Sequence, residues 1–344
     1  MKRFLYIGIY SEGSTSKMRA DKLIKMLDGW ECKVIDTNIP KQSCNKFWQS
    51  LGFRKKIGPV IWRVNKYVLG RLEHEHYDLI WVDKAIYLTQ KTTGILRDKT
   101  DKLVHFSPDP AFKFHRSHHF EKSAQIYDYL ITTKSFELDD YVNAAGAKEK
   151  VLFATQGYDK NIHRPLVAWK DKHGLVFIGH AEEGRKHTLQ QLLNAGIDVT
   201  LAGIEWDGFA ERNKGNPHLN YLGQGVFGED YVKAICSGLF AWGAVSKWIP
   251  EKHTTRTFEI PACKTALVTE RNEELLGFFS DEEVIYYADE QDMVSRIVYY
   301  DQHRDELKAI IEAGYKAVTE GGYDYESIIK HLLDKVLENG KYRS

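Results

Sequence analysis

Ten residues near position 260 carry the most specific chemical pattern of the chain. Residues 254–263, TTRTFEIPAC, place Arg256, Glu259 and a proline between a polar loop and an apolar strand at residues 266–268. A glutamate just inside a helix N-terminus lies beside free backbone N–H groups and the positive end of the helix dipole. Its carboxylate accepts hydrogen bonds from a sugar diol, while the N–H groups face an anion. The pattern predicts a site for a ligand that carries both hydroxyls and phosphates.

A second loop offers positive charge for the same ligand. Residues 179–186, GHAEEGRK, come after an apolar strand, and ligands of doubly wound sheets bind beyond the carboxyl ends of strands. Arg185 could neutralise a diphosphate by bidentate hydrogen bonds and Lys186 as a point charge, and Gly179 opens the loop. A solvated charge cluster explains the same residues.

A third loop could hold a nucleobase. Residues 224–228, QGVFG, precede a predicted helix, so their backbone could bind the edge of a base while Val226 or Phe227 packs on its face. A strand-to-helix turn with a core phenylalanine is the alternative. Thr255, beside Arg256, adds a donor for phosphate oxygens.

Two loops of the first half complete the set. Residues 11–16, SEGSTS, contain Gly13, and their small side chains let the backbone approach a phosphate or sugar, as in a plain strand-to-helix turn. In residues 107–110, SPDP, Asp109 is the candidate general base or hydrogen-bond anchor for an attacking hydroxyl, together with His105. A rigid structural turn explains the same proline-rich run.

Strand and helix patterns alternate along the chain and position these loops. Short apolar runs bounded by turn residues predict strands, and the intervening apolar spacing predicts helices, so each half is of the α/β class with a parallel sheet. The predicted strands are residues 4–10, 32–36, 77–83, 102–106, 129–134 and 150–154 in the first half, and 174–179, 197–203, 238–244, 266–270 and 282–288 in the second.

A polar linker divides the two halves. Residues 156–166, QGYDKNIHRPL, contain glycine and proline, and the alternation restarts after them. We expect an N-terminal Rossmann-like acceptor domain at residues 1–165 and a C-terminal Rossmann-like donor domain at residues 166–325, facing each other across a cleft. A closing helix at residues 326–344 is expected to pack back on the N-terminal domain.

One segment of the first half has an unusual composition. Residues 47–72 mix Phe47, Trp48, Phe53, Trp62 and Tyr67 with lysines and arginines. An amphipathic helical excursion packed on the sheet explains this pattern. An acceptor-binding lip or a membrane-surface contact explains it as well.

Bulk composition narrows the classes of protein. Lys+Arg and Asp+Glu both number 48, so the zero net charge does not indicate a generic polyanion binder. The four cysteines form no CxxC pair, which indicates a reducing compartment and neither a disulfide framework nor a zinc site. No apolar run reaches the length of a membrane span and the N-terminus lacks a signal-peptide pattern, so we expect a cytoplasmic protein.

With these residues assembled, the chain resembles the CgeB-like (spore-maturation type) glycosyltransferases, which have the GT-B architecture. The most specific match is TTRTFEIPAC, and FIGHAEEGRK, AGIDVTLAGIEW and YLGQGVFGEDYVKAI also match. The likeness extends more loosely into the first half through WVDK and HFSPDP, and leaves residues 47–72 outside.

The resemblance implies a nucleotide-sugar donor bound mainly by the second domain. Glu251 and Glu259 stand in an E-x7-E spacing, and the second glutamate of that pattern holds the ribose hydroxyls. Diphosphate contacts would then fall on Arg256, Thr255, Arg185 and Lys186, and the base near Val226 and Phe227. Such enzymes need no bound metal and no cofactor. Lys264 stands where the family usually has glycine, and its cation could contact the phosphates or cap the helix.

The predicted function is transfer of a hexosyl or pentosyl group from a nucleoside diphosphate to a hydroxyl acceptor. A glycan, a lipid-linked glycan, a protein or a modified nucleobase could supply that hydroxyl, and UDP, GDP or dTDP could carry the sugar. A nucleotide-sugar epimerase of the same architecture and a non-catalytic carbohydrate-binding relative are the alternatives.

Overall fold

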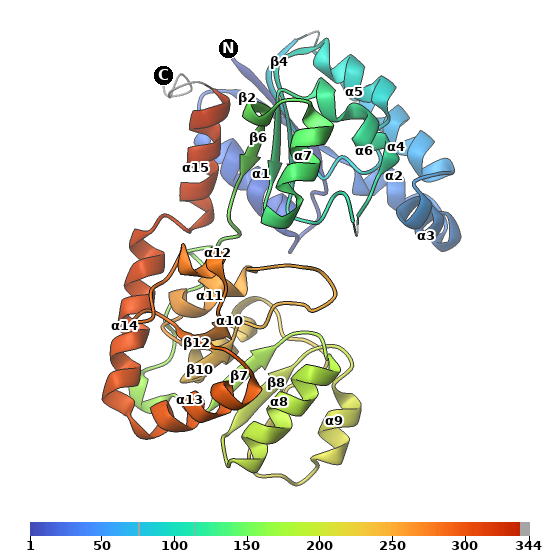
Figure 1. Cartoon of the computed structure of the whole chain (residues 1–344). Coiled ribbons are helices and arrows are strands. Elements are labelled where there is room, and N and C mark those ends of the chain that lie inside the picture. Colours follow the sequence, from blue (N-terminus) through green and yellow to red (C-terminus); the bar gives the residue numbers. More distant parts are fainter. Residues whose placement is uncertain (75, 114, 338–344) are drawn as a thin grey trace. The chain divides into compact units, whose positions relative to one another are not determined.

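The chain divides into two compact units, seen in Figure 1. The computed structural model describes residues 1–74, 76–113 and 115–337. The N-terminal unit joins Met1–Thr155 to the residues from Glu326 onward, and the C-terminal unit spans Gln156–Tyr325. Residues 338–344 of the predicted closing helix lie outside the described part.

A parallel sheet forms the centre of the N-terminal unit. Among the described residues it has six strands in the order β2-β1-β3-β4-β5-β6. The central strands β1, β3 and β4 are buried along most of their length, as expected of a parallel sheet covered on both faces. The strands are β1 (Arg3–Gly8), β2 (Glu31–Asp36), β3 (Tyr77–Asp83), β4 (Thr100–Ser107), β5 (Tyr129–Thr132) and β6 (Val151–Phe153).

Helices connect these strands. Those of the N-terminal unit are α1 (Thr15–Met26), α2 (Asn38–Gln42), α3 (Lys46–Lys55), α4 (Pro59–Leu69), α5 (Gln90–Arg97), α6 (His118–Ser123), α7 (Leu138–Ala145) and α15 (Tyr325–Val336). Glu326 at the start of α15 forms an ion pair with Lys22 of α1, at 3.6 Å between Nζ and Oε1. This pair joins the end of the described chain to the first helix of the unit.

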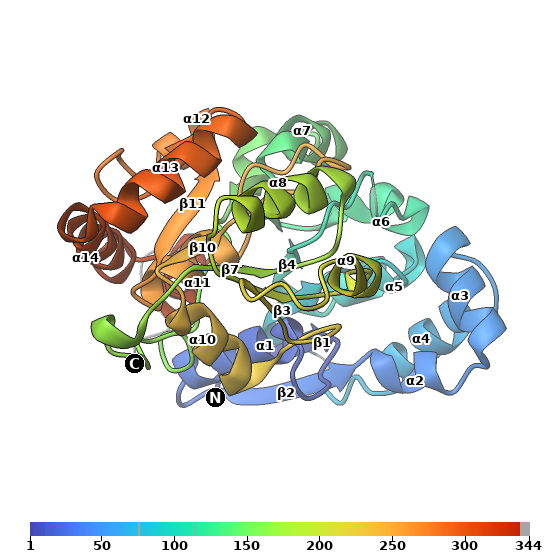
Figure 2. The ribbon, with the colours of Figure 1, turned by 90° about the horizontal axis from the view of Figure 1, so that it is seen from below.

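Helices α2, α3 and α4 together occupy the segment between β2 and β3. Figures 1 and 2 both show them side by side at one end of the N-terminal unit. Val60, Val64 and Val68 of α4 are buried and belong to the core of the unit. The predicted helical excursion at residues 47–72 therefore exists, and the buried side of α4 attaches it to the unit.

The C-terminal unit repeats the parallel design with a different strand order. Its described residues form a six-stranded sheet in the order β12-β11-β10-β7-β8-β9. The strands are β7 (Leu175–Ile178), β8 (Val199–Ala202), β9 (Leu219–Tyr221), β10 (Phe240–Trp242), β11 (Ala266–Glu270) and β12 (Ile285–Tyr287). The helices are α8 (Glu183–Asn194), α9 (Asp207–Arg212), α10 (Gly228–Ser237), α11 (Arg256–Ala262), α12 (Glu273–Leu276), α13 (Glu290–Gln302) and α14 (Arg304–Glu320).

Each sheet has one point where the strand order reverses. The chain builds one side of the sheet first and then crosses over, so the reversal lies between β1 and β3 in the N-terminal unit and between β7 and β10 in the C-terminal unit. Loops beyond the carboxyl ends of strands at such a point form the usual ligand crevice of doubly wound sheets. The prediction of two Rossmann-like α/β units is confirmed. The strand order places the candidate loops at these crevices.

Candidate functional site

A pocket of about 440 Å³ lies at the switch point of the C-terminal unit. The loops after β7, β8 and β9 form part of its wall, and the start of α11 forms another part. We name it the α11 pocket. Its lining includes six residues predicted from the sequence, namely Gly179, Val226, Phe227, Thr255, Arg256 and Glu259.

Buried aromatic packing fixes α11 in place. Phe258 is completely buried and stacks on Tyr323, with ring centroids 4.7 Å apart, and it also packs against Phe278. Pro261 cannot donate a backbone hydrogen bond, and the helix ends directly after it. The aromatic anchor thus holds Glu259, the next residue along the helix, at the pocket wall.

The Tyr231 side chain holds the Glu259 carboxylate, and the His163 ring lies close to it. The Tyr231 hydroxyl of α10 donates to its Oε2 at 2.6 Å, and His163 Nε2 lies 3.6 Å from its Oε1. His163 Nδ1 accepts from the Asp159 backbone N–H, so the neutral ring carries its proton on the Nε2 that faces Glu259. Burial raises the pKa of Tyr231 far above its usual range, and the Glu259 charge raises it further. Tyr231 therefore stays protonated and orients the carboxylate.

The first residue of α11 and the loop before the helix hold buried polar atoms without partners among the described residues. Arg256 Nε and the Thr254 hydroxyl are buried and make no hydrogen bond to any described residue. The one hydrogen bond found for the Arg256 guanidinium in that part of the chain runs from Nη2 to the Ala244 carbonyl at 3.4 Å. A buried donor without an acceptor is costly, so these groups fit a site that an anionic ligand completes.

The loop before α11 is anchored by a buried histidine. His253 Nε2 accepts from the Gln156 backbone N–H at 2.9 Å, so its Nδ1 carries the proton and donates to the Glu274 carboxylate. These bonds fix the backbone directly ahead of Thr254. Glu251, the first member of the E-x7-E spacing, does not line the α11 pocket.

The predicted base contacts lie at the rim of the pocket. Phe227 is 84 % exposed, and it immediately precedes α10. Gly228, the first residue of α10, has φ +58, which a side chain rarely adopts. Val226 is half-buried beside it. An exposed ring at a pocket rim is free to pack on a planar ligand group.

Arg185 and Lys186 line a neighbouring hollow instead of the α11 pocket. The Arg185 guanidinium donates to the His180 and Val245 carbonyls at 2.9 and 3.0 Å and forms an ion pair with Glu182 at 2.9 Å. It therefore ties the loop after β7 to the loop after β10. Lys186 pairs with Glu183 at 2.6 Å on the same helix.

Lys264 lies at the opposite end of α11. Its φ of +53 is in the left-handed region that favours glycine, directly after the C-cap Cys263. Its ammonium contacts Glu312 of α14 at 2.6 Å. Of the two roles considered for this lysine, the structure favours capping the helix.

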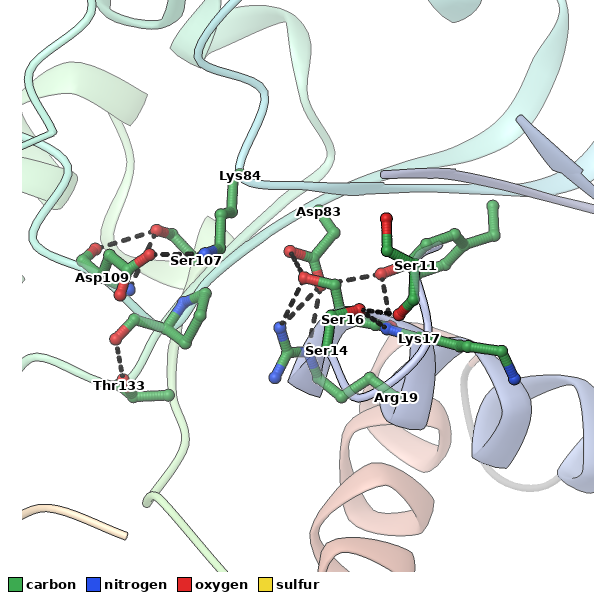
Figure 3. A network of polar contacts seen from close by, with 12 residues as sticks. Ser11, Ser14, Ser16, Lys17, Arg19, Asp83, Lys84, Ser107, Asp109 and Thr133 are labelled. Carbon is green, nitrogen blue, oxygen red and sulfur yellow. Dashed lines mark hydrogen bonds and ion pairs between the residues drawn. The ribbon is translucent and has the colours of Figure 1, made fainter. Parts of the chain in front are cut away.

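The switch point of the N-terminal unit has a different electrostatic design, shown in Figure 3. Asp83 at the end of β3 accepts from Arg19 Nε at 3.0 Å and from the Ser16 hydroxyl at 3.1 Å, and the Tyr6 hydroxyl lies 2.9 Å from it. Asp83 and Arg19 are both buried. The loop with Gly13, at φ +74, leads into α1 above this network, where the Ser14 hydroxyl caps the helix.

Asp109 is half-buried beside this network and forms an ion pair with Lys84 at 2.7 Å. Burial by itself would raise the pKa of Asp109, but the charge and hydrogen bond of Lys84 outweigh it and hold the pKa below its usual range. The carboxylate is therefore ionised at neutral pH. An ionised carboxylate can accept a hydrogen bond from a hydroxyl, in line with the anchor role considered for it.

His105 lies inside the core of the N-terminal unit. It is completely buried in β4, stacks on Phe120 with centroids 4.1 Å apart, and burial lowers its pKa to about 3. A ring enclosed in this way has no access to a substrate, so the structure gives no support to the catalytic role expected for His105.

Comparisons with known proteins agree with this architecture. Residues 185–334 match the model of a family described as glycosyl transferase-like, and no curated protein sequence matches the chain. A glycosyltransferase structure from Rickettsia africae is 12% identical with a TM-score of 0.69, and covers 98% of this chain and 99% of its own. The fold is GT-B.

Two further structures show the same fold. Anabaena Alr3699/HepE, solved with UDP and glucose, is 12% identical with a TM-score of 0.65 over 98% of this chain and 100% of its own. Sucrose-phosphate synthase from Thermosynechococcus elongatus is 11% identical with a TM-score of 0.68, and the match covers 96% of this chain and 97% of its own. At these identities the likeness establishes the GT-B fold, and the CgeB-like assignment stays a prediction.

Tyr231 and His163 were not predicted from the sequence. Both come close to Glu259 only when the chain folds, because each is 28 or more residues from Glu259 along the chain.

Within the described residues, no three His, Cys, Asp or Glu side chains gather closely enough to hold a metal ion. No helix in that part of the chain is long and apolar enough to cross a membrane.

Proposed function

We propose that the chain transfers a sugar from a nucleoside diphosphate to a hydroxyl group. One observation carries the proposal: Arg256 Nε is buried without a partner in the described structure, and Arg256 lines the same pocket as the oriented Glu259 carboxylate. A nucleoside diphosphate fits both groups. Its phosphates accept a hydrogen bond from Arg256, and its ribose hydroxyls donate hydrogen bonds to Glu259.

Two comparisons support this choice of ligand. The glycosyl transferase-like match spans Arg256, Glu259 and Phe227. Anabaena Alr3699/HepE, which shares the fold, was solved with UDP-glucose as well as with UDP. UDP is therefore the first diphosphate to test, with GDP and dTDP beside it.

Six side chains that line the α11 pocket have a place in this proposal, and Arg185 supports them from the neighbouring hollow. Glu259 accepts from the ribose hydroxyls, while Tyr231 fixes its orientation. Phe227 and Val226 pack on the base. Arg256 and Thr255 contact the diphosphate, and Arg185 acts as a positioning residue because its own donors are already bonded to protein.

In the reaction, the bond between the sugar C1 and the diphosphate oxygen breaks, a bond from C1 to the acceptor oxygen forms, and the proton of the acceptor hydroxyl passes to the Asp109 carboxylate. The leaving diphosphate gains negative charge, and a preorganised cation lowers the free energy of that transition state. We assign this cation role to Arg256 and propose that the enzyme needs no metal. Activity is then expected to persist in EDTA.

The N-terminal unit supplies the acceptor side in the proposal. Asp109, ionised beside Lys84, accepts a hydrogen bond from the attacking hydroxyl. The acceptor belongs to one of the four hydroxyl-bearing classes considered from the sequence, and the CgeB-like group is the proposed family.

A donor screen tests the function. UDP-, GDP- and dTDP-sugars are incubated with the full chain, and nucleotide release is measured with and without a mixture of acceptors. Wild type is expected to release the nucleotide from only one of the three kinds of donor. Glu259→Gln is expected to reduce kcat/KM for that donor about 100-fold, which is the loss typical of a charged hydrogen bond to a substrate. Glu183→Gln, at an exposed site of α8, is the matched control and is expected to retain activity.

The outcomes separate the alternatives. Epimerisation of the sugar without acceptor would assign the epimerase reaction in place of transfer. Unchanged turnover in Glu259→Gln would refute the assignment of the site, and absence of binding by any nucleotide in a thermal-shift panel would leave a non-catalytic relative.

A further inference from the structure

The helical excursion between β2 and β3 differs in charge from the rest of the chain. Residues 37–72 contain eight Lys and Arg and no Asp or Glu. Since each sign numbers 48 in the whole chain, the remaining residues hold 40 basic and 48 acidic side chains. The zero net charge thus conceals one strongly basic segment in an acidic background.

Most of this positive charge faces solvent. Six of the eight basic side chains are exposed, and none of these six forms an ion pair with a described residue: Lys46, Arg54, Lys55, Arg63, Lys66 and Arg71. Elsewhere, the exposed Lys247 and the half-buried Lys264 each pair with a carboxylate. The excursion therefore presents positive charge that its own unit does not neutralise.

Large apolar side chains stand among these cations. Phe47 is 67 % exposed, Trp62 62 %, Ile39 53 % and Ile57 51 %. Trp62 projects from the outer side of α4, opposite the buried valines, and Lys66 lies over its ring at 4.9 Å. Exposed aromatic and aliphatic groups beside lysines mark an interaction surface, because scattered single residues would not collect on one excursion.

Five of these exposed residues, Ile39, Ile57, Trp62, Arg63 and Lys66, line one continuous surface. Trp62 and Lys66 line two adjacent grooves, one shared with Ile39 and Arg63 and the other with Ile57. Trp62 thus separates the grooves and joins their walls. We name the exposed residues of α2, α3 and α4 the α2–α4 surface.

We propose that the α2–α4 surface docks on an anionic lipid bilayer. Exposed lysines and arginines pair with lipid phosphates, while Trp62 and Phe47 lie at the headgroup level, where aromatic rings concentrate. Ile39 and Ile57 favour a bilayer over a nucleic acid, because aliphatic tips gain from an apolar interior and cannot stack on bases in the way aromatic rings do. Residues 37–72 contain no acidic side chain, and the one carboxylate that lines either groove, Glu73, is paired with Lys33, so little repulsion opposes the lipid charge.

Vesicle co-sedimentation of the full chain tests this proposal. Vesicles of phosphatidylcholine with about one third phosphatidylglycerol should bind the protein, binding should fall as salt rises, and vesicles of phosphatidylcholine alone should bind weakly. Each basic residue near an anionic surface contributes roughly fivefold in partitioning, so Arg63→Glu with Lys66→Glu should reduce binding about 30-fold or more. Trp62→Ala with Phe47→Ala should also reduce it.

Matched control variants test whether a change of net charge or the loss of any exposed aromatic side chain is enough to reduce vesicle binding. Lys308→Glu with Lys316→Glu makes the same charge change at exposed positions of α14, and Trp248→Ala removes an aromatic that is 68 % exposed in the C-terminal unit. Both should bind vesicles as wild type does, and circular dichroism confirms that every variant is folded.

Three outcomes would overturn the proposal: equal binding to both vesicle types, equal losses in the α14 control, or no vesicle binding while single-stranded nucleic acid is bound through the same residues. None of these readouts depends on nucleotide-sugar turnover, so failure here leaves the proposed function untouched.

Discussion

The two sheets of this chain differ in the segment that comes after their second strand. In the C-terminal unit, β8 leads through α9 to a third strand, β9, and the loop after β9 forms part of the α11 pocket. In the N-terminal unit, β2 leads into α2, α3 and α4, and no described strand extends the sheet beyond β2. The same position in the design thus supplies a pocket wall in one unit and an exposed basic surface in the other.

The two switch points differ in whether their basic side chains have carboxylate partners within the protein. Arg19 and Lys84 of the N-terminal unit have carboxylate partners within the protein, whereas Arg256 of the C-terminal unit has a buried Nε without one among the described residues. A paired network stabilises the folded unit, while an unpaired buried donor costs stability until a ligand completes it. If the proposed function holds, similar sheets use arginine in two ways: Arg19 stabilises the folded unit, and Arg256 binds a ligand.

The largest expected effect breaks the paired network. Arg19→Met leaves Asp83 buried without its cation, and such uncompensated charges cost about 3–5 kcal/mol. Urea denaturation measures the loss. Lys17→Met, which removes the exposed pair with Asp21, is the control and should cost at most about 0.5 kcal/mol. Equal small effects of both variants would refute the structural role of the network.

A pH experiment probes the buried histidine of the same unit. Because the pKa of folded His105 is about 3 and that of the unfolded chain is about 6.5, the unfolded state binds more protons between these values. The contribution of His105 to stability is thus lost as pH falls below 6.5. When the pH falls from 6.5 to 5, the free energy of unfolding of His105→Leu should decrease by about 2 kcal/mol less than that of wild type. Parallel pH profiles of the two proteins would place His105 outside the core.

A smaller effect tests the orientation of Glu259. Tyr231→Phe removes the hydroxyl that donates to the carboxylate, and about tenfold weaker nucleotide binding is expected by calorimetry. Tyr10→Phe removes a similar hydroxyl–carboxylate contact, with Asp21 in the N-terminal unit, and should leave affinity unchanged. Undiminished affinity of Tyr231→Phe would show that Glu259 needs no such support.

The smallest effect concerns the end of α11. Lys264→Gly relieves a left-handed backbone conformation but removes the ion pair with Glu312. Since exposed pairs contribute little, a gain of about 0.5–1 kcal/mol in the free energy of unfolding is expected, with unchanged nucleotide binding. Weaker binding would instead place the Lys264 cation at the phosphates.

The sequence predicted the elements better than their contacts. Apolar runs such as residues 77–83 identify strands because parallel strands are buried on both faces. Arg256 and Glu259 could be paired in advance because one short helix carries both. The partners of Arg185 could not, since the Val245 carbonyl meets it only after folding. The burial of His105 could not be predicted, because Phe120 and Tyr127 pack against its ring only after folding.

The central claim is that Glu259 binds a ribose and Arg256 binds a diphosphate in one pocket. Calorimetry with the diphosphate that wild type binds best, and with its own nucleoside, tests both parts together. Glu259→Ala should weaken both ligands, whereas Arg256→Met should weaken the diphosphate about 100-fold and leave the nucleoside unchanged. An Arg256→Met variant that loses both ligands equally, or neither, would contradict the account.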